Sequence, residues 1–194
     1  MNPSWCIATG RLFLRPVWGG DFADLVALKA DPRVFAVMLG GVRTPTQTAE
    51  ELAADIAFWG KHGVGMWAAR SRADDTFLGT AGLLERADGR GMALRFAFRP
   101  EWRGQGLASE AALAALRFGH DRAGLDRIVA VARQDNFASR ILLGSIGMVP
   151  CEEFMRQGVP MVTFESLRGA RRTMVELRGI EPLTSSLRTR RSPS

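Results

Sequence analysis

A glycine-containing turn between two apolar segments is the first stretch of the chain whose residue types could do chemistry. It spans residues 103–108 and reads Arg-Gly-Gln-Gly-Leu-Ala. A turn of this kind ahead of a helix exposes backbone N–H groups at the positive end of the helix dipole, where an anion can bind. The spacing Arg-x-x-Gly-x-Ala matches neither the P-loop nor the dinucleotide fingerprint with its third glycine. Two interpretations stay open at this point, a phosphate-bearing ligand and a tight turn that only starts a helix.

Four predicted elements must hold this turn and the polar residues that follow it. Residues 93–98 are apolar and short enough for a buried strand, and residues 107–122 are rich in Ala and Leu, as in a helix. Residues 127–131 form a nearly continuous apolar run, which is typical of a buried strand. Asn136 is then expected near the start of a short helix, which Gly147 ends.

The chain before the turn predicts one strand and then two helices. Residues 11–16 form a short apolar run between arginines, stopped by a proline, and indicate a strand. Asp21 is expected to cap a helix that ends near residue 32. Thr44 is expected to cap a second helix, with Gln47 completing a capping box, and this helix ends near Gly63.

Four further strands are expected, in two pairs. Residues 65–70 and 77–84 predict a hairpin, and residues 151–156 and 161–167 predict two more strands near the end of the folded region. With the other elements, this order of strands and helices indicates an α+β fold.

The histidines and cysteines carry no metal-ligand or nucleophile pattern. We expect His62 and His120 to lie exposed at helix ends rather than in a catalytic site. Cys6 and Cys151 are far apart in the sequence, which predicts reduced thiols in a cytoplasmic protein. A nucleophilic Cys151 is an alternative to a packed thiol.

Charge and length suggest one domain followed by a basic tail. The chain has 194 residues and a net charge of +6. Residues 169–194 hold six arginines and two acids, so they carry +4 and leave +2 for residues 1–168. We therefore expect a folded domain over 1–168 and a disordered tail over 169–194. The nearly balanced domain makes nucleic-acid binding an unfavoured partner class, and no apolar run is long enough for a membrane span.

Two sets of residues together resemble a known family. Arg103-x-x-Gly106-x-Ala108 resembles the acyl-CoA-binding signature of the GNAT acetyltransferases, whose general form is Arg/Gln-x-x-Gly-x-Gly/Ala. The family's later pattern is matched at its own offsets by Asn136, Ser139, Leu143, Gly147 and Met148. The resemblance covers roughly residues 9–168, and its details look most like the branch that acetylates the N-terminal amine of ribosomal proteins. It implies a GNAT-like central mixed, mostly antiparallel sheet flanked by helices.

The resemblance also implies a site for acetyl-CoA as cosubstrate, without a metal. The turn would hold the pyrophosphate, the strand edge would bind the pantetheine arm, and one strand N–H would polarise the thioester carbonyl. Asn136 would bind the pantetheine amides and could cap its helix at the same time. The cosubstrate-binding residues implied are Phe96, Ala97, Phe98, Arg103, Gly104, Gln105, Gly106, Leu107, Ala108 and Asn136.

The sequence departs from the family at the catalytic acid and at the base. Leu143 stands where a general-acid tyrosine is usual, and the whole chain contains no Tyr. Ser139 is the hydroxyl left on that helix face, so the resemblance implies Ser139 and Asn136 as the catalytic residues. Ala93 stands where the branch often has a glutamate. The remaining candidate bases are Glu85, Glu152, Glu153 and Glu165, for each of which a solvated surface acid is the alternative.

These residues predict an acetyl-CoA-dependent N-acetyltransferase that transfers the acetyl group directly to a primary amine. The acceptor would be a small molecule or a protein N-terminus, and the enzyme a monomer or homodimer. A catalytically decayed CoA-binding or interaction module is the alternative, since Leu143 and Ala93 depart from the family pattern.

Overall fold

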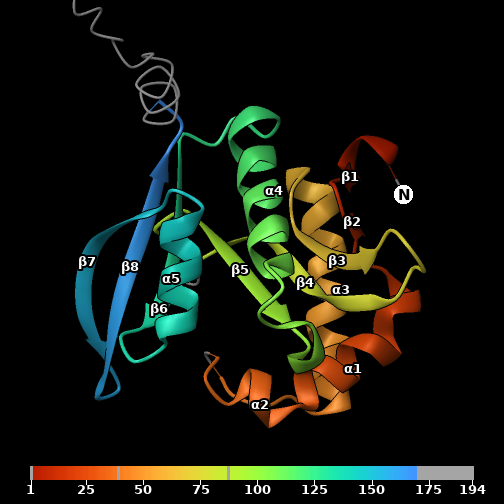
Figure 1. Cartoon of the computed structure of the whole chain (residues 1–194), viewed down its shortest axis with the longest axis horizontal. Helices are drawn as coiled ribbons and strands as arrows, with labels where there is room; N and C mark the ends of the chain where they lie inside the picture. Colours follow the sequence, from red (N-terminus) through yellow and green to blue (C-terminus); the bar gives the residue numbers. More distant parts are fainter. Residues whose placement is uncertain (1, 39, 87, 170–194) are drawn as a thin grey trace, which may run out of the picture.

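The computed structural model describes residues 2–38, 40–86 and 88–169. It contains eight strands and five α-helices within these residues (Figure 1). The strands are β1 (Ile7–Ala8), β2 (Leu12–Pro16), β3 (Met66–Ser71), β4 (Phe77–Glu85), β5 (Met92–Phe98), β6 (Arg127–Arg133), β7 (Val149–Arg156) and β8 (Val159–Leu167). The α-helices are α1 (Phe22–Ala30), α2 (Pro32–Phe35), α3 (Pro45–His62), α4 (Leu107–Asp121) and α5 (Phe137–Ser145).

All eight strands belong to one sheet in the order β1-β2-β3-β4-β5-β6-β8-β7. Neighbouring strands are antiparallel except β5 and β6, which are parallel. The α+β class and the mixed, mostly antiparallel sheet flanked by helices are thereby confirmed. The predicted hairpin between residues 65–70 and 77–84 is the β3–β4 pair.

Helices cover both faces of the sheet and enclose two hydrophobic clusters. On one face α4 packs Ala111, Ala115 and Leu116 with Leu83 and Leu94 of the sheet. The small alanines let this helix approach the strands closely. On the other face, residues of α1, α2 and α3 pack against β3, β4 and β5. The middle of the sheet is therefore buried on both sides, which explains the near-continuous burial of β4.

The start of α3 follows directly from its sequence. Thr44 accepts a hydrogen bond from the Gln47 backbone N–H at 3.2 Å, and the Gln47 side chain accepts one from the Thr44 N–H at 2.9 Å. The predicted capping box is confirmed. The helix ends at Gly63, which adopts a left-handed conformation.

Two local predictions are wrong because residues outside the helix concerned bind the two side chains. Asp21 precedes α1 but makes no capping bond, and instead lies fully buried against Arg15 at 2.6 and 2.7 Å. His120 is buried, not exposed. Its Nδ1 lies 2.6 Å from the Leu125 carbonyl and its Nε2 lies 3.0 Å from the Ser166 hydroxyl. These contacts tie α4 to β8 and to the loop before β6.

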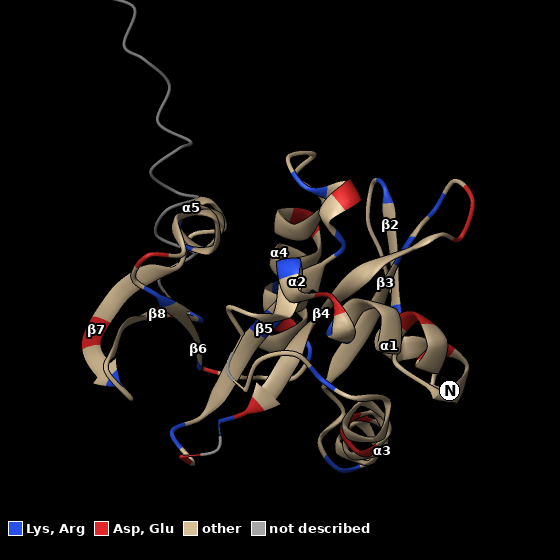
Figure 2. Cartoon of the chain, turned by 90° about the horizontal axis from the view of Figure 1, so that it is seen from below, with Lys and Arg blue, Asp and Glu red and all other residues tan. Residues whose placement is uncertain are grey.

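The remaining features concern charge and the chain end. Figure 2 shows Lys and Arg interspersed with Asp and Glu over the described residues, as the nearly balanced charge of 1–168 led us to expect. Cys6 and Cys151 are both free thiols. Among the described helices, none has the length and apolarity needed to cross a bilayer. The predicted tail lies outside the described residues from 170 onward.

Candidate active site

The sheet opens between its two parallel strands. Within the described residues, β5 pairs with β6 at Met92↔Ile128 and Ala93↔Val129 and at no later position. Beyond Ala93, β5 is paired on its other side only, with β4. Its free edge therefore presents backbone N–H and C=O groups that a strand-like ligand can bind.

The N-terminus of α4 lies at the end of this free edge and is a candidate anion site. Gly106 caps the helix with a φ of 74° and no side chain caps it. Gly104 has a φ of 75°, so both glycines occupy the left-handed region that other residues disfavour. The first N–H groups of this 15-residue helix are thus left for a ligand at the positive end of its dipole.

A pair of side chains from outside the turn braces it. Arg11, just before β2, donates from Nη1 to the Gln105 carbonyl at 2.7 Å and from Nε to Glu110 at 2.7 Å. Glu110, in the first turn of α4, also accepts from the Arg11 backbone N–H at 2.9 Å and from the Thr9 hydroxyl at 2.6 Å. Burial opposes the ionisation of Glu110, but these hydrogen bonds outweigh it and lower its pKa. The segment just before β2 therefore holds the turn in place through Arg11.

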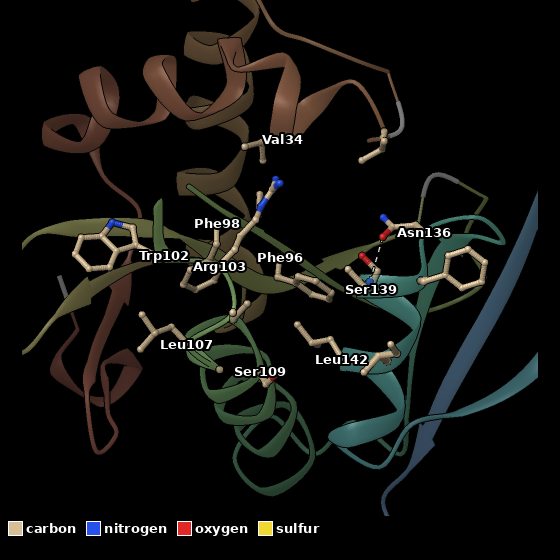
Figure 3. A pocket seen from close by; sticks show the side chains of 18 of the residues that line it. Val34, Phe96, Phe98, Trp102, Arg103, Leu107, Ser109, Asn136, Ser139 and Leu142 are labelled. Atoms are coloured by element: carbon tan, nitrogen blue, oxygen red, sulfur yellow. Dashed lines mark hydrogen bonds between the residues drawn. The ribbon is translucent and has the colours of Figure 1, made fainter. Parts of the chain in front are cut away.

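A cavity of about 730 Å³ joins the turn, the free edge of β5 and the start of α5 (Figure 3). Most of the predicted site residues line it. These are Phe96, Ala97, Phe98, Arg103, Gly104, Gly106, Leu107, Ala108, Asn136 and Ser139. Gln105 is not among the lining residues, because its carbonyl faces Arg11 and its side-chain amide donates to the Glu101 carbonyl at 3.4 Å.

Asn136 and Ser139 lie on the α5 side of the cavity, and Phe96 of β5 lies across from them (Figure 3). The Asn136 side-chain oxygen accepts from the Ser139 backbone N–H at 3.1 Å and caps α5. Its amide nitrogen remains available to donate into the cavity. Both interpretations of Asn136 are therefore compatible, with the cap itself confirmed.

Other hydroxyls and acids are arranged less favourably for catalysis. Leu143 is 1% exposed and packs in the core, so this position does not line the cavity. Ser145 lines it, but its hydroxyl donates to the Leu142 carbonyl at 2.7 Å. The four candidate bases all lie outside the lining, and two of them are ion-paired: Glu152 with Arg90 and Glu165 with Arg127.

The sequence did not predict α2 or its position opposite the turn. Val34, Val37 and Met38 line the cavity opposite the turn, and Arg103 donates to the Arg33 carbonyl at 2.7 Å. These residues lie about 70 positions before the turn, and no local pattern links the two segments. By contrast, the signal for α5 was present: Phe137 and Ile141 are apolar, one helical turn apart, and largely exposed beside the cavity.

A family model and a bacterial relative match this chain. Residues 11–149 match the model described as "Acetyltransferase (GNAT) domain". The relative is a Bacillus subtilis protein named "Uncharacterized protein YkkB", 25% identical over 168 residues, with 85% of this chain and 97% of that protein covered.

Solved structures share the fold. A GNAT-family acetyltransferase from Bacillus anthracis superposes with a TM-score of 0.74 at 21% identity, covering 84% of this chain and 98% of that chain. A putative ribosomal-protein-serine acetyltransferase from Vibrio cholerae gives 0.70 at 20% identity, over 86% and 99%. The Vibrio cholerae spermidine N-acetyltransferase, solved with CoA and spermine, gives 0.68 at 16% identity, over 82% and 97%.

Proposed function

Because the chain belongs to the GNAT acetyltransferase family, we propose that it transfers the acetyl group of acetyl-CoA directly to a primary amine. The observation that carries this proposal is the continuity of the cavity. The uncapped start of α4, the free edge of β5 and the Asn136–Ser139 end of α5 all border one space. Acetyl-CoA has a pyrophosphate, a pantetheine arm with two amides, and a thioester, and these parts would lie along the three surfaces in this order.

The residues fit the cosubstrate on chemical grounds. The N–H groups at the start of α4 suit the pyrophosphate, and Arg103 adds a positive charge beside them. The free edge of β5 suits the amides of the pantetheine arm, with the Asn136 amide as a further donor. One N–H of residues 96–98 would polarise the thioester carbonyl, a contribution worth about 100–1000-fold in rate in comparable sites.

In the transfer, the amine nitrogen attacks the carbonyl carbon, the C–N bond forms and the C–S bond breaks. The sulfur takes its proton from the Ser139 hydroxyl, which recovers one from solvent. The amine loses its proton to water. No covalent intermediate with the protein is required.

The deprotonation step favours a weakly basic amine. Within the described residues, none of the four candidate glutamates lines the cavity. The one carboxylate that does line it, Asp135, is held by Arg133 at 2.7 and 3.0 Å, and this hydrogen bonding lowers the pKa of Asp135, so it is a poor base. A lysine amine with a pKa of about 10.4 needs about 4 kcal/mol to be neutral near pH 7.5, whereas an α-amine with a pKa of about 7.7–8.0 needs less than about 1 kcal/mol. We therefore favour an α-amine or another weakly basic amine over a lysine side chain.

Two acceptor classes known from similar structures are worth testing first. One similar structure is described as a ribosomal-protein-serine acetyltransferase and another as a spermidine N-acetyltransferase. For this chain, protein N-termini are accordingly the first candidates, and polyamines, whose amines are about as basic as lysine, are the comparison class. We propose a cytoplasmic enzyme, as the reduced cysteines and the amine chemistry suggest, with residues 1–168 as its catalytic domain.

A thiol-release screen with acetyl-CoA over N-terminal peptides, polyamines and aminoglycosides tests this proposal. We expect release of CoA thiol that depends on the amine. Measured binding of acetyl-CoA without release for any amine would instead establish the decayed binding module, which the buried Leu143 in place of a tyrosine keeps as the second candidate. Matched α-amine and lysine peptides test the acceptor preference, and faster acetylation of lysine would contradict it.

A further inference from the structure

The cavity is lined from both faces of the sheet. Leu107 and Phe96 line it and belong to the hydrophobic cluster on the α4 side. Val34 and Ala97 also line it, but they belong to the cluster on the opposite side. Figure 3 shows Val34 on one side of β5 and Leu107 on the other. The cavity therefore passes through the opening between β5 and β6 and can be reached from either face.

The two faces offer different surfaces to a ligand. The start of α4, with its unpartnered N–H groups, lies on the first face and suits the pyrophosphate of the cosubstrate. The second face presents three apolar side chains, Val34, Val37 and Met38, which we call the α2 wall. A cosubstrate that occupies the first face leaves the α2 wall for the acceptor.

Hydrogen bonds hold the α2 wall in place beside the turn. Arg103 donates to the Arg33 carbonyl at 2.7 Å, and Asp31 caps α2 by accepting from the Arg33 backbone N–H at 2.8 Å. Val34 is buried and anchors the wall in the hydrophobic cluster, whereas Val37 is 45% exposed. An apolar surface that is fixed in position and open to a cavity is suited to binding an apolar group.

The charged side chains that line the cavity already have partners. Within the described residues they are Arg33, Arg103 and Asp135. Arg33 donates from Nη2 to Asp31 at 2.7 Å, and Asp135 accepts from Arg133 at 2.7 Å. Arg103 is bound to the carbonyl of Arg33 and is proposed to meet the cosubstrate. The lining thus has no uncommitted carboxylate that could bind a second ammonium group of an acceptor.

We propose that the acceptor amine is carried on a large apolar group and that this group packs against the α2 wall. This inference rests on the proposed function and specifies its substrate class. A peptide that begins with a large apolar residue has this chemistry, and so does a small alkylamine. In both, burial of the apolar group against Val37 and Met38 would hold the amine at the opening of the sheet, where the thioester would lie.

Other amines fit this surface less well. A polyamine would place a charged ammonium group against the α2 wall, where water is displaced and no carboxylate replaces it. A peptide that begins with a small or polar residue would bury little apolar area there. The α2 wall therefore predicts selection by the side chain next to the amine.

Steady-state kinetics with matched acceptors test the proposal. The peptide probes are Leu-Ala-Ala, Asn-Ala-Ala and Asp-Ala-Ala amides, in which the first side chains have similar shapes and different polarity. The small probes are hexylamine, cadaverine and spermidine. We expect Leu-Ala-Ala amide and hexylamine to have the highest kcat/KM of their sets, by about tenfold or more. The set with the higher values identifies the source of the acceptor.

Two valines of the segment between α2 and α3 provide a matched pair of variants. Val37 and Val42 are 45% and 44% exposed, but only Val37 lines the cavity. Val37→Ser should raise the KM for Leu-Ala-Ala amide about tenfold, because it removes apolar area from the α2 wall. It should leave the KM for Asn-Ala-Ala amide and the Kd of CoA unchanged. Val42→Ser should change none of these quantities.

The possible failures of this inference and of the proposed function differ. Turnover with a preference for Asn-Ala-Ala amide, Asp-Ala-Ala amide or spermidine would overturn the inference while the proposed function stands. The same holds if Val37→Ser leaves the preference for Leu-Ala-Ala amide intact, or if it weakens CoA binding as much as acceptor binding. Absence of turnover with every amine would overturn the proposed function itself.

Discussion

At the scale of single residues, the wall of the cavity limits which group can act as the acid. Three serines line it, Ser109, Ser139 and Ser145. The Ser145 hydroxyl donates to a carbonyl, and Ser109 lies in the first turn of α4, beside the proposed phosphate site. Ser139 stands at the opposite end, next to Asn136, where the reacting end of a pantetheine arm would arrive.

Replacing this serine should affect the chemical step alone. Ser139→Ala is expected to lower kcat about 100-fold, because a positioned acid typically contributes that much or more. The affinity for acetyl-CoA should not change, because the hydrogen bond that positions Asn136 uses the backbone of Ser139 and not its side chain. Stopped assays of thiol release and calorimetry measure the two quantities. Ser145→Ala is the matched control, and an equal loss of rate in both variants would contradict the role of Ser139.

Local sequence patterns predicted residues whose partners are local. Asn136 caps α5 and Thr44 caps α3, because each bonds a backbone group three residues away. Asp21 and His120 were misjudged for the opposite reason. Arg15 on β2 and Ser166 on β8, their partners, come from other elements, and no capping or periodicity pattern predicts these contacts.

At the scale of elements, the conformation of the turn at residues 103–106 depends on a segment almost a hundred residues earlier in the chain. Arg11 and Glu110 join the start of β2 to the first turn of α4, and Arg11 also holds the Gln105 carbonyl. The turn contains two left-handed glycines, and because glycine adopts many conformations, the turn needs support to keep one of them. The brace thus preorganises the N–H groups that a phosphate would meet.

Removing the brace should weaken cosubstrate binding. Arg11→Ala is expected to raise the Kd of CoA about tenfold, because the ordering of the turn must then occur on binding. Isothermal titration calorimetry measures this. Arg72→Ala is a suitable control, since Arg72 donates to the Thr9 carbonyl at 2.6 Å in the same region without contacting the turn. A Kd that rises equally in both variants would indicate a general loss of order instead.

Elements with strong periodicity or caps were predicted, and short ones were not. The strand, turn and helix around residues 93–122 emerged from apolar runs and glycines. The sequence analysis missed β1, with two residues, and α2, with four, because neither is long enough to show a period. The failure to predict α2 matters for the site, because the region of α2 forms the wall of the cavity opposite the turn.

At the scale of the whole molecule, Asp55 costs stability. Its pKa is about 6 in the folded protein against an ordinary value of 3.8. Between these values only the folded state holds the proton, so the free energy of unfolding falls as pH rises through this window and stays lower above it. A group retained at such a cost is typical of a functional position.

Asp55→Asn should therefore stabilise the protein at neutral pH. We expect a gain of at most about 3 kcal/mol in the free energy of unfolding above pH 6, shrinking toward zero near pH 4. Urea unfolding at several pH values measures the difference. Glu50→Gln, which changes an exposed acid of the same helix, should show no such dependence. A wild type that is as stable as Asp55→Asn at pH 7.5 would refute this explanation.

The opening between β5 and β6 gives the sheet a hinge. Five strands lie on one side of it and three on the other, and the two halves share the residue pairs at Met92 and Ala93 as their only ladder within the described residues. Ala93 and Val129 are buried there, so a change in the size of either side chain would act on how the two halves pack. Affinity for whatever fills the opening can thus be tuned at the hinge, by residues that never touch the ligand.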